Sequence, residues 1–215
     1  MKIKTNYPDA LSSPDYYDPI GAKQDNHSNE NYLADLARVA GKDKFSYLDL
    51  GCAGGQSVVD LHSRGHIACG VEGSDLNIML NHSLNHVDKN WKLYKDICLF
   101  KADITKPFLL SNGIDNIAHK FDIVTAWDVL EHPKEDNIPA VLENIKLHLS
   151  ETGKFICLIN TTPGHHHQCV KPFSWWDRIF REHNFVSIGW DFNTSPRHLS
   201  NPLGDEDFGF ILQLK

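Results

Sequence analysis

Titratable side chains gather in two short segments of this chain. Asp128, Glu131 and His132 fall on one short stretch, and consecutive histidines occupy positions 165–167. An imidazole titrates near neutral pH and can act as a general base. Carboxylates and imidazoles together also suit magnesium, manganese or zinc. Three ligands on one turn do not complete a metal site, so we assign no metal ligand and leave the metal interpretation open.

Acidic residues follow the apolar runs that we expect to form the strands of a sheet. These acids are Glu72, Asp103 and Asp128. Ligands of open α/β sheets bind in the crevice at the carboxyl ends of the strands. We therefore expect the three acids to converge on one crevice.

A turn of small residues follows the first apolar run and precedes a helical pattern. It reads Asp49, Leu50, Gly51, Cys52, Ala53, Gly54, Gly55. Small residues let a backbone approach a ligand closely, and the helix start that follows offers free N–H groups. The pattern is Asp-x-Gly-x-Ala-x-Gly, so the dinucleotide fingerprint Gly-x-Gly-x-x-Gly does not fit.

The ordered set of turn and acids resembles class I methyltransferases that depend on S-adenosylmethionine, over roughly residues 45–215. The resemblance implies that the turn passes beneath the methionine part of this cofactor and that Glu72 holds the ribose hydroxyls. It also places Asp103 at the adenine amino group, with Ile104 against the ring. Ala53 stands where the family often has glycine. The remaining expected cofactor contacts are Asp49, Gly51, Cys52, Gly55, Gly73 and Trp127.

The resemblance places Trp127 and Asp128 beside the chamber of methyl transfer. Transfer from a sulfonium is an in-line displacement, and a hydroxyl nucleophile also needs a base or a metal to remove its proton. We predict Asp128, His132 and His167 as catalytic residues. The acid-x-x-acid-His spacing also resembles the metal-binding motif of methyltransferases of ubiquinone precursors and of small-RNA 3′ ends. For the histidines at 165–167, a solvated loop is the alternative.

Alternating strand and helix patterns predict an α/β fold, a Rossmann-like seven-stranded mostly parallel sheet with helices on both faces. The resemblance implies that the last strand is antiparallel. Residues 1–44 are expected to form an N-terminal arm and lid helix, and residues 45–215 the cofactor-binding domain. The segment 105–119 contains Pro107 and Gly113 and is predicted as a short helix and loop.

The expected strands are 45–50, 67–71, 97–101, 121–126, 154–160, 185–190 and 208–214. The expected helices are 29–39, 55–64, 75–85, 135–149 and 173–183. For the first helix, Ser28 is the predicted N-cap and Gly41 follows the end.

Composition narrows the class of protein. The 215 residues carry a formal net charge of -7, which argues against an extended basic face for nucleic acid. Five cysteines, mostly in predicted strands, indicate core residues in a reducing compartment such as the cytoplasm. The N-terminus lacks the apolar stretch of a secretory signal, and no apolar run reaches the length of a membrane span.

These features predict a methyltransferase that acts on a small-molecule or sugar hydroxyl, closest to the small-molecule O-methyltransferases of ubiquinone biosynthesis. The stretch after the fourth strand lacks the Asn/Asp-Pro-Pro-Tyr type of sequence found in adenine or glutamine N-methyltransferases. A metal-assisted RNA-terminal methyltransferase is one alternative, but we find no convincing cluster of Arg and Lys. A catalytically silent binding subunit is another, and the intact glycine turn and Glu72 argue against it.

Overall fold

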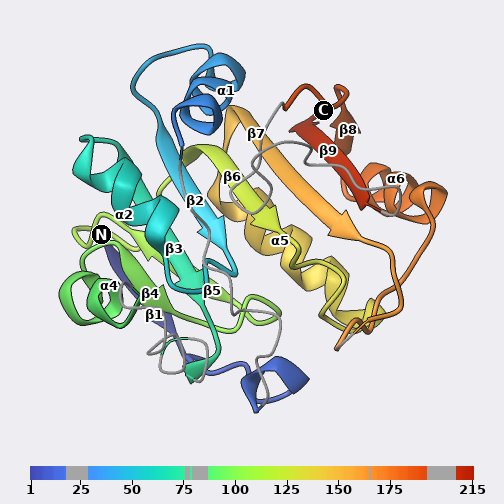
Figure 1. Cartoon of the computed structure of the whole chain (residues 1–215), viewed down its shortest axis with the longest axis horizontal. Helices are drawn as coiled ribbons and strands as arrows, with labels where there is room; N and C mark the ends of the chain where they lie inside the picture. The colour runs from blue at the N-terminus through green and yellow to red at the C-terminus, as the bar shows by residue number, and fades with distance from the viewer. Residues whose placement is uncertain (18–28, 76–77, 79–86, 165, 193–206) are drawn as a thin grey trace.

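A seven-stranded sheet forms the centre of the computed structural model, which describes residues 1–17, 29–75, 78, 87–164, 166–192 and 207–215 (Figure 1). The strand order is β4-β3-β2-β6-β7-β9-β8. The strands are β2 Ser46–Leu50, β3 Ile67–Glu72, β4 Leu99–Lys101, β6 Phe121–Trp127, β7 Leu149–Asn160, β8 Phe185–Ser187 and β9 Asp207–Leu214. The pairs β2–β3, β2–β6, β3–β4 and β6–β7 are parallel, whereas β9 is antiparallel to both β7 and β8. The predicted fold class and the antiparallel last strand are confirmed.

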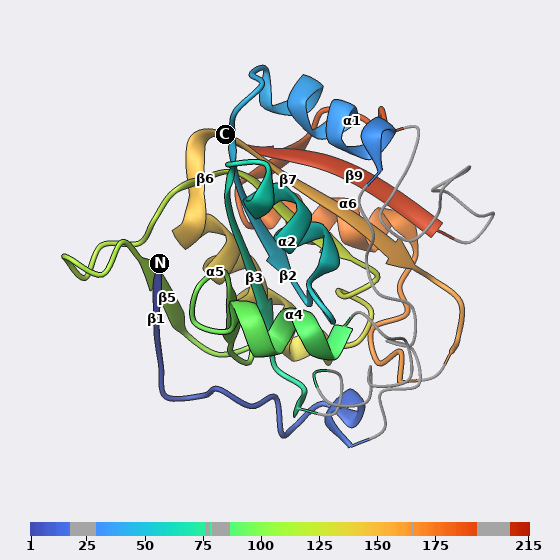
Figure 2. The ribbon, with the colours of Figure 1, turned by 60° about the vertical axis from the view of Figure 1, so that its left-hand side comes forward.

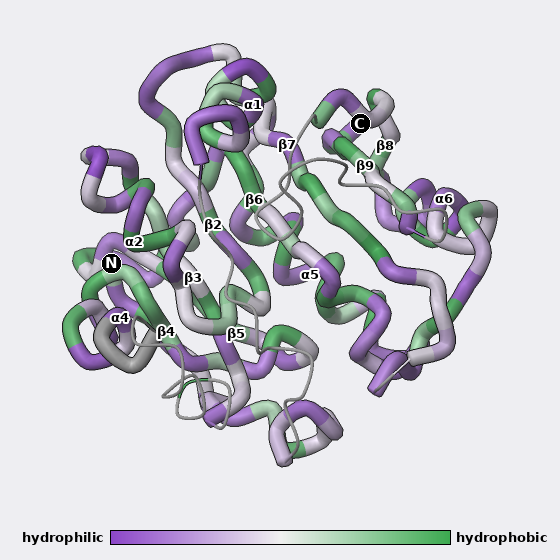
Figure 3. The backbone as a smooth tube through the Cα atoms, viewed as in Figure 1, coloured by the Kyte–Doolittle hydropathy of each residue, from purple (hydrophilic) through white to green (hydrophobic). Residues whose placement is uncertain are grey.

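Helices cover both faces of this sheet (Figure 2). On one face lie α1 (Glu30–Ala40), α2 (Gln56–Ser63) and α4 (Val87–Tyr94), and on the other lie α5 (Ile138–His148) and α6 (Phe173–Glu182). In Figure 3, where the backbone is coloured by the hydropathy of each residue, hydrophobic residues predominate along the central strands. A strand that is buried on both faces needs such a continuous apolar run, which is why these strands were recognisable in the sequence.

Side chains of β2 point alternately into the two hydrophobic clusters on the two faces of the sheet. Tyr47 belongs to the cluster that contains Tyr32 of α1, whereas Leu48 and Leu50 belong to the cluster that contains Leu142 of α5. Successive side chains of a strand point to opposite faces, so both layers are held by the same short run.

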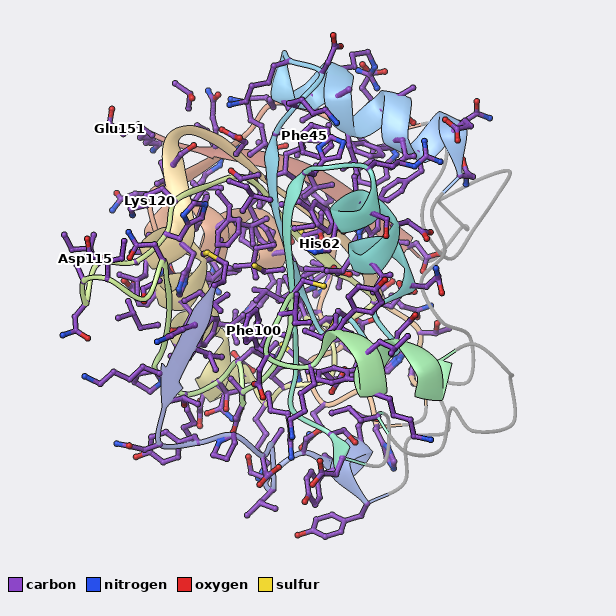
Figure 4. All side chains as sticks on the ribbon, turned by 90° about the vertical axis from the view of Figure 1, so that its left-hand side faces the viewer. Phe45, His62, Phe100, Asp115, Lys120 and Glu151 are labelled. Carbon is purple, nitrogen blue, oxygen red and sulfur yellow. The ribbon has the colours of Figure 1, made fainter. Side chains whose placement is uncertain are left out.

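The prediction of a short helix in residues 105–119 is wrong. The segment contains strand β5 (Phe108–Ser111), which pairs antiparallel with β1 (Lys2–Thr5) in a separate two-stranded sheet. Phe108 and Leu110 are buried against the α5 face of the main sheet. The chain then projects outward through Asp115 and returns at Lys120, as Figure 4 shows. The strand forms because a partner from the chain terminus completes its hydrogen bonds, and local periodicity does not contain that partner.

Several boundaries also differ from the predicted ones. The N-cap of α1 is Asn29, whose side chain accepts a 2.9 Å hydrogen bond from the Tyr32 N–H, while Gly41 ends the helix at φ 68° as expected. The predicted helix 135–149 begins as a 3-10 turn, η4 (Glu135–Asn137), and α5 ends at His148, so β7 starts earlier than predicted. Most of the predicted helix 75–85 lies outside the described residues, and α4 was not predicted.

The five cysteines are all free and buried, in agreement with their expected role as core residues. Among the helices in the described part of the chain, none combines the length and the apolar character that a membrane span requires.

His148 joins the β1–β5 ribbon to α5 as a buried neutral histidine. Its Nδ1 donates to the Asn144 carbonyl oxygen at 2.8 Å, and its Nε2 accepts the Leu110 N–H at 3.0 Å. The ring stacks on Phe108 with 4.8 Å between centroids. Burial lowers the pKa of His148 from its ordinary 6.5 to about 4. Protonation would also convert the accepting nitrogen into a donor facing another donor.

We therefore predict that acid destabilises the fold through this residue. The unfolded chain binds a proton at His148 below pH 6.5, but the folded chain does so only near pH 4. The contribution of His148 to the free energy of unfolding is therefore fully present above pH 6.5. It falls by on the order of 3 kcal/mol as the pH drops toward 4. Urea denaturation at several pH values measures this loss. The variant His148→Gln should show a smaller loss between pH 7 and 4, and an equal loss in both proteins would contradict the assignment.

Candidate functional site

A pocket of about 290 Å³ opens at the carboxyl ends of the central strands. Residues that follow β2, β3, β4 and β6 contribute to its wall, as do residues of the N-terminal segment. The predicted residues that line it are Gly51, Ala53, Glu72, Gly73, Asp103, Ile104, Asp128, His132 and His167. The expected convergence of Glu72, Asp103 and Asp128 on one crevice is therefore observed.

The turn after β2 needs glycine at its first small position. Gly51 has φ 69°, a left-handed conformation, and an added Cβ would lie 2.6 Å from Val129 Cγ2. The N–H groups of Gly51 and Cys52 both donate to the Val71 carbonyl oxygen, at 2.8 and 3.1 Å. These bonds tie the turn to the end of β3 and bring its backbone to the pocket wall.

Glu72 is a nearly buried carboxylate held in place by backbone donors. Its Oε2 accepts the Ala53 N–H at 3.1 Å, and its Oε1 accepts the Ser74 N–H at 2.8 Å. Its exposed fraction is 7%. A carboxylate has about four acceptor sites, so both oxygens retain capacity for a ligand's hydroxyl groups.

Asp103 occupies the corresponding place after β4. Its Oδ1 accepts bonds from the N–H and the hydroxyl of Thr105, at 2.9 and 2.6 Å. Its own N–H donates to the Tyr7 carbonyl oxygen at 2.9 Å, which links this loop to the N-terminal segment. Ile104, which is partly buried, adds an apolar surface to the same wall.

The loop after β6 carries the strained and titratable residues. Asp128 has φ 50°, an uncommon conformation for a residue other than glycine, and its N–H donates to the Leu158 carbonyl oxygen at 3.0 Å. Glu131 is completely buried, and its Oε1 accepts the Asn160 N–H at 3.1 Å. Burial, reinforced by the charge of Asp128, raises the pKa of Glu131 to about 8.

Two of the predicted histidines meet at the edge of this loop. The rings of His132 and His167 pack edge to face with 4.9 Å between centroids. His167 Nδ1 donates to the Thr162 carbonyl oxygen at 2.8 Å. One ligand atom from each of Glu131, His132 and His167 lies within 4.8 Å of the others. Glu131 Oε2 is buried and accepts no hydrogen bond within the described structure, so this donor set fits a divalent cation by position and ligand type.

A residue that the sequence did not reveal completes this group of side chains. Asp15, from the N-terminal segment, makes a hydrogen bond with His166, and its Oδ2 lies 2.8 Å from His132 Nδ1. Burial alone would raise the pKa of the Asp15 carboxyl, but the two histidines outweigh it and hold this pKa below its ordinary value. No local signal distinguishes Asp15, because His166 lies 151 positions away in the chain. His165, the first histidine of the tract at 165–167, lies outside the described residues.

Four predicted cofactor contacts do not line the pocket. Trp127 packs on the α1 face, where its Nε1 donates to the Tyr32 hydroxyl at 3.2 Å. Asp49 is buried and accepts the Thr125 hydroxyl at 2.7 Å. Cys52 and Gly55 also do not belong to the pocket wall, and Cys52 is fully buried. These residues shape the turn and the sheet beneath the pocket, and their direct contact with a cofactor lacks geometric support.

Comparisons with known proteins agree with this architecture. Residues 24–193 match the family described as a methyltransferase domain. A protein from Pyrococcus horikoshii OT3 has a similar structure, with a TM-score of 0.63 and 16% identity over 94% of this chain and 99% of that chain. An S-adenosylmethionine-dependent methyltransferase from Clostridium acetobutylicum gives 0.61 and 14%, over 85% and 89% of the two chains.

A third similar structure was solved with S-adenosylmethionine bound. It is the glycopeptide N-methyltransferase MtfA, with a TM-score of 0.58 and 10% identity over 89% of this chain and 95% of that chain. No curated protein sequence matches the chain. The match to the family covers most of the chain, and the pocket lies where the fold places its ligand. The chain therefore belongs to the methyltransferase-domain family.

Proposed function

We propose that this protein transfers the methyl group of S-adenosylmethionine to a hydroxyl group of a small molecule or a sugar. The observation that carries the proposal is that Glu72, Asp103 and His132 all line one pocket. Groups suited to hold a nucleoside and a group suited to remove a proton therefore share a single cavity. The formal net charge of the chain, -7, also favours a small acceptor over nucleic acid.

The binding roles follow from the chemistry of each side chain. The fixed Glu72 carboxylate would accept both ribose hydroxyls in charge-assisted hydrogen bonds. Asp103 would accept the adenine amino group, and Ile104 would contact the ring. The backbone of Gly51 and Ala53 would lie against the methionine part, where the left-handed conformation of Gly51 permits close approach.

In the chemical step, the protein has to align the acceptor hydroxyl with the methyl group and remove the proton of that hydroxyl. When bound, the cofactor supplies the methyl group together with its own leaving group. His132 would take the proton of the acceptor hydroxyl as the oxygen forms its bond to the methyl carbon. The Asp15 carboxylate lies 2.8 Å from His132 Nδ1 and Asp128 lines the same pocket, so both acids would stabilise the imidazolium that results. The N-terminal segment, which lines the pocket through Ser13 and Tyr16, would exclude water.

Two measurements test this proposal in sequence. Isothermal titration calorimetry with S-adenosylhomocysteine should give a saturable binding curve, and absence of binding would favour a silent binding subunit. A mass-shift screen with catechols, sugars and RNA ends, in the presence of S-adenosylmethionine, should then show a gain of one methyl group on a hydroxyl. Methylation confined to nitrogen would overturn the hydroxyl assignment, and one similar structure is that of an N-methyltransferase.

The cluster of Glu131, His132 and His167 favours a second candidate, a metal-assisted transfer such as RNA-terminal methylation. These residues would hold a divalent cation that lowers the pKa of the acceptor hydroxyl. Titration with manganese or zinc salts would then show binding to the wild-type protein and none to Glu131→Gln. Activity that persists after dialysis against EDTA would exclude this candidate.

A further inference from the structure

Helix α4 packs beside the glycine turn that follows β2. The helix lies next to α2 on one face of the sheet (Figure 2), and its residue Trp91 is buried in the hydrophobic cluster of that face. Trp91 Nε1 donates to the Ala53 carbonyl oxygen at 2.8 Å, and the neighbouring Asn90 side chain donates to Gln56 Oε1 at 3.0 Å. An indole nitrogen can only donate, so the direction of the Trp91 bond does not depend on pH. The helix therefore holds the turn at Ala53 and at the start of α2.

Ala53 is the residue of this turn that adopts a left-handed conformation although it is not glycine. Its φ is 49°, a value that glycine reaches freely but that a residue with a side chain reaches only with strain. Its N–H donates to Glu72 Oε2 at 3.1 Å, and its carbonyl oxygen accepts the Trp91 indole N–H. Two hydrogen bonds, one to each backbone polar group of Ala53, thus keep the strained backbone in place.

These bonds connect Trp91 to the carboxylate that we assign to the ribose. Trp91 holds the Ala53 carbonyl, the Ala53 N–H holds Glu72, and both Ala53 and Glu72 line the pocket. Trp91 does not line the pocket, so it can act on a bound cofactor only through the turn. The exposed fractions are 4% for Trp91, 2% for Ala53 and 7% for Glu72. Water therefore has little access to replace a hydrogen bond that is lost within this group.

We propose that Trp91 is a positioning residue that keeps Ala53 in its left-handed conformation, so that the turn and Glu72 are arranged for S-adenosylmethionine before it binds. The inference rests on the proposed function, in which the Ala53 backbone and the Glu72 carboxylate contact this cofactor. A turn that is arranged beforehand does not have to be ordered on binding, which raises the affinity. Loss of the Trp91 donor should therefore raise KM for the cofactor and leave kcat at saturating cofactor near its wild-type value.

Calorimetry with S-adenosylhomocysteine on Trp91→Phe tests the proposal. Phenylalanine keeps an aromatic ring in the cluster but removes the donor, so the affinity should fall by about tenfold, the cost of restoring a left-handed alanine on binding. The matched control is Trp176→Phe. Trp176 is fully buried on the other face of the sheet, and its Nε1 makes no hydrogen bond within the described residues. This control should bind with the wild-type affinity, and thermal unfolding of both variants measures the loss of stability.

The variant Ala53→Gly separates positioning from packing. Glycine adopts the left-handed conformation without strain, so a turn with glycine depends less on its anchor. In the Ala53→Gly background, Trp91→Phe should therefore lower the affinity by less than about threefold. A role of Trp91 in packing alone predicts the same loss of affinity in both backgrounds.

Hydrogen exchange of the wild type adds a measurement that needs no variant. The indole N–H signal of Trp91, assigned by triple-resonance NMR, should exchange with deuterium more slowly once S-adenosylhomocysteine saturates the protein, because the ligand holds the turn against the indole. The indole N–H of Trp127, which donates to the Tyr32 hydroxyl on the α1 face, should keep its rate. An unchanged rate at Trp91 in the saturated protein would contradict the proposal.

The outcomes separate this inference from the proposed function. Equal affinity in the wild type and Trp91→Phe would overturn the role of Trp91, and so would an equal loss of affinity in Trp91→Phe and Trp176→Phe. An undiminished effect of Trp91→Phe in the Ala53→Gly background would also overturn it. Absence of S-adenosylhomocysteine binding by the wild type would instead overturn the proposed function, and this inference with it.

Discussion

Replacing His132 with alanine is expected to lower kcat by roughly 10²–10⁴-fold, the usual contribution of a positioned general acid or base. The acceptor hydroxyl would lose the group that takes its proton, while Glu72, Asp103 and the glycine turn would still hold the cofactor. The dissociation constant of S-adenosylhomocysteine should therefore stay close to that of the wild type. Steady-state kinetics with the acceptor found in the mass-shift screen, together with calorimetry, measure the two quantities separately.

A matched control is available outside the pocket. His62 lies on α2 and contacts the Tyr94 ring, and it does not line the pocket (Figure 4). The variant His62→Ala should keep the wild-type kcat. If His132→Ala turned over as fast as this control, the base would have to be another group. If His132→Ala lost cofactor affinity in proportion to activity, its role would be binding.

Replacing Glu72 with alanine is expected to weaken the binding of S-adenosylhomocysteine by about 100-fold. Two charge-assisted hydrogen bonds to the ribose would be lost, which together correspond to about 3 kcal/mol. Calorimetry measures the change directly. The variant Glu72→Gln keeps the shape and some acceptor capacity but loses the charge, so its affinity should fall between those of the wild type and Glu72→Ala.

The same substitution also removes the acceptor of the Ala53 and Ser74 N–H groups. Thermal unfolding should therefore accompany the binding measurement, because a loosened turn would lower both stability and affinity. Glu151→Ala, at an exposed position of β7, is the control for the loss of a carboxylate (Figure 4). Unchanged affinity in Glu72→Ala, in a protein as stable as the control, would show that the ribose is held elsewhere.

The parts of the fold that were predictable from the sequence are those that depend on short-range patterns. The central strands β2, β3 and β6 are buried on both faces and therefore appear as apolar runs. The carboxyl ends of β3, β4 and β6 lie at one edge of the parallel part of the sheet, so Glu72, Asp103 and Asp128 line one pocket. The turn at Gly51 was also recognisable, since its left-handed backbone selects glycine.

The parts that were not predictable depend on partners that are distant in the chain. Strand β5 forms against β1, and Pro107 and Gly113 on either side of it suggested a loop. Trp127 directly precedes Asp128 in the sequence, yet its ring packs on the α1 face while Asp128 lines the pocket. Adjacent residues at the end of a strand diverge in this way because successive side chains point to opposite faces.

The sequence alone determined the alternation of strands and helices, the glycine turn and the acids at the strand ends, because each arises from the chemistry of neighbouring residues. The tertiary structure was needed to show that Asp15 lies beside His132, that Glu131 is fully buried, and that His167 lies close to Glu131 and His132. Protonation and tautomer are set by burial and by nearby charges, and these come from whichever segments the fold brings together.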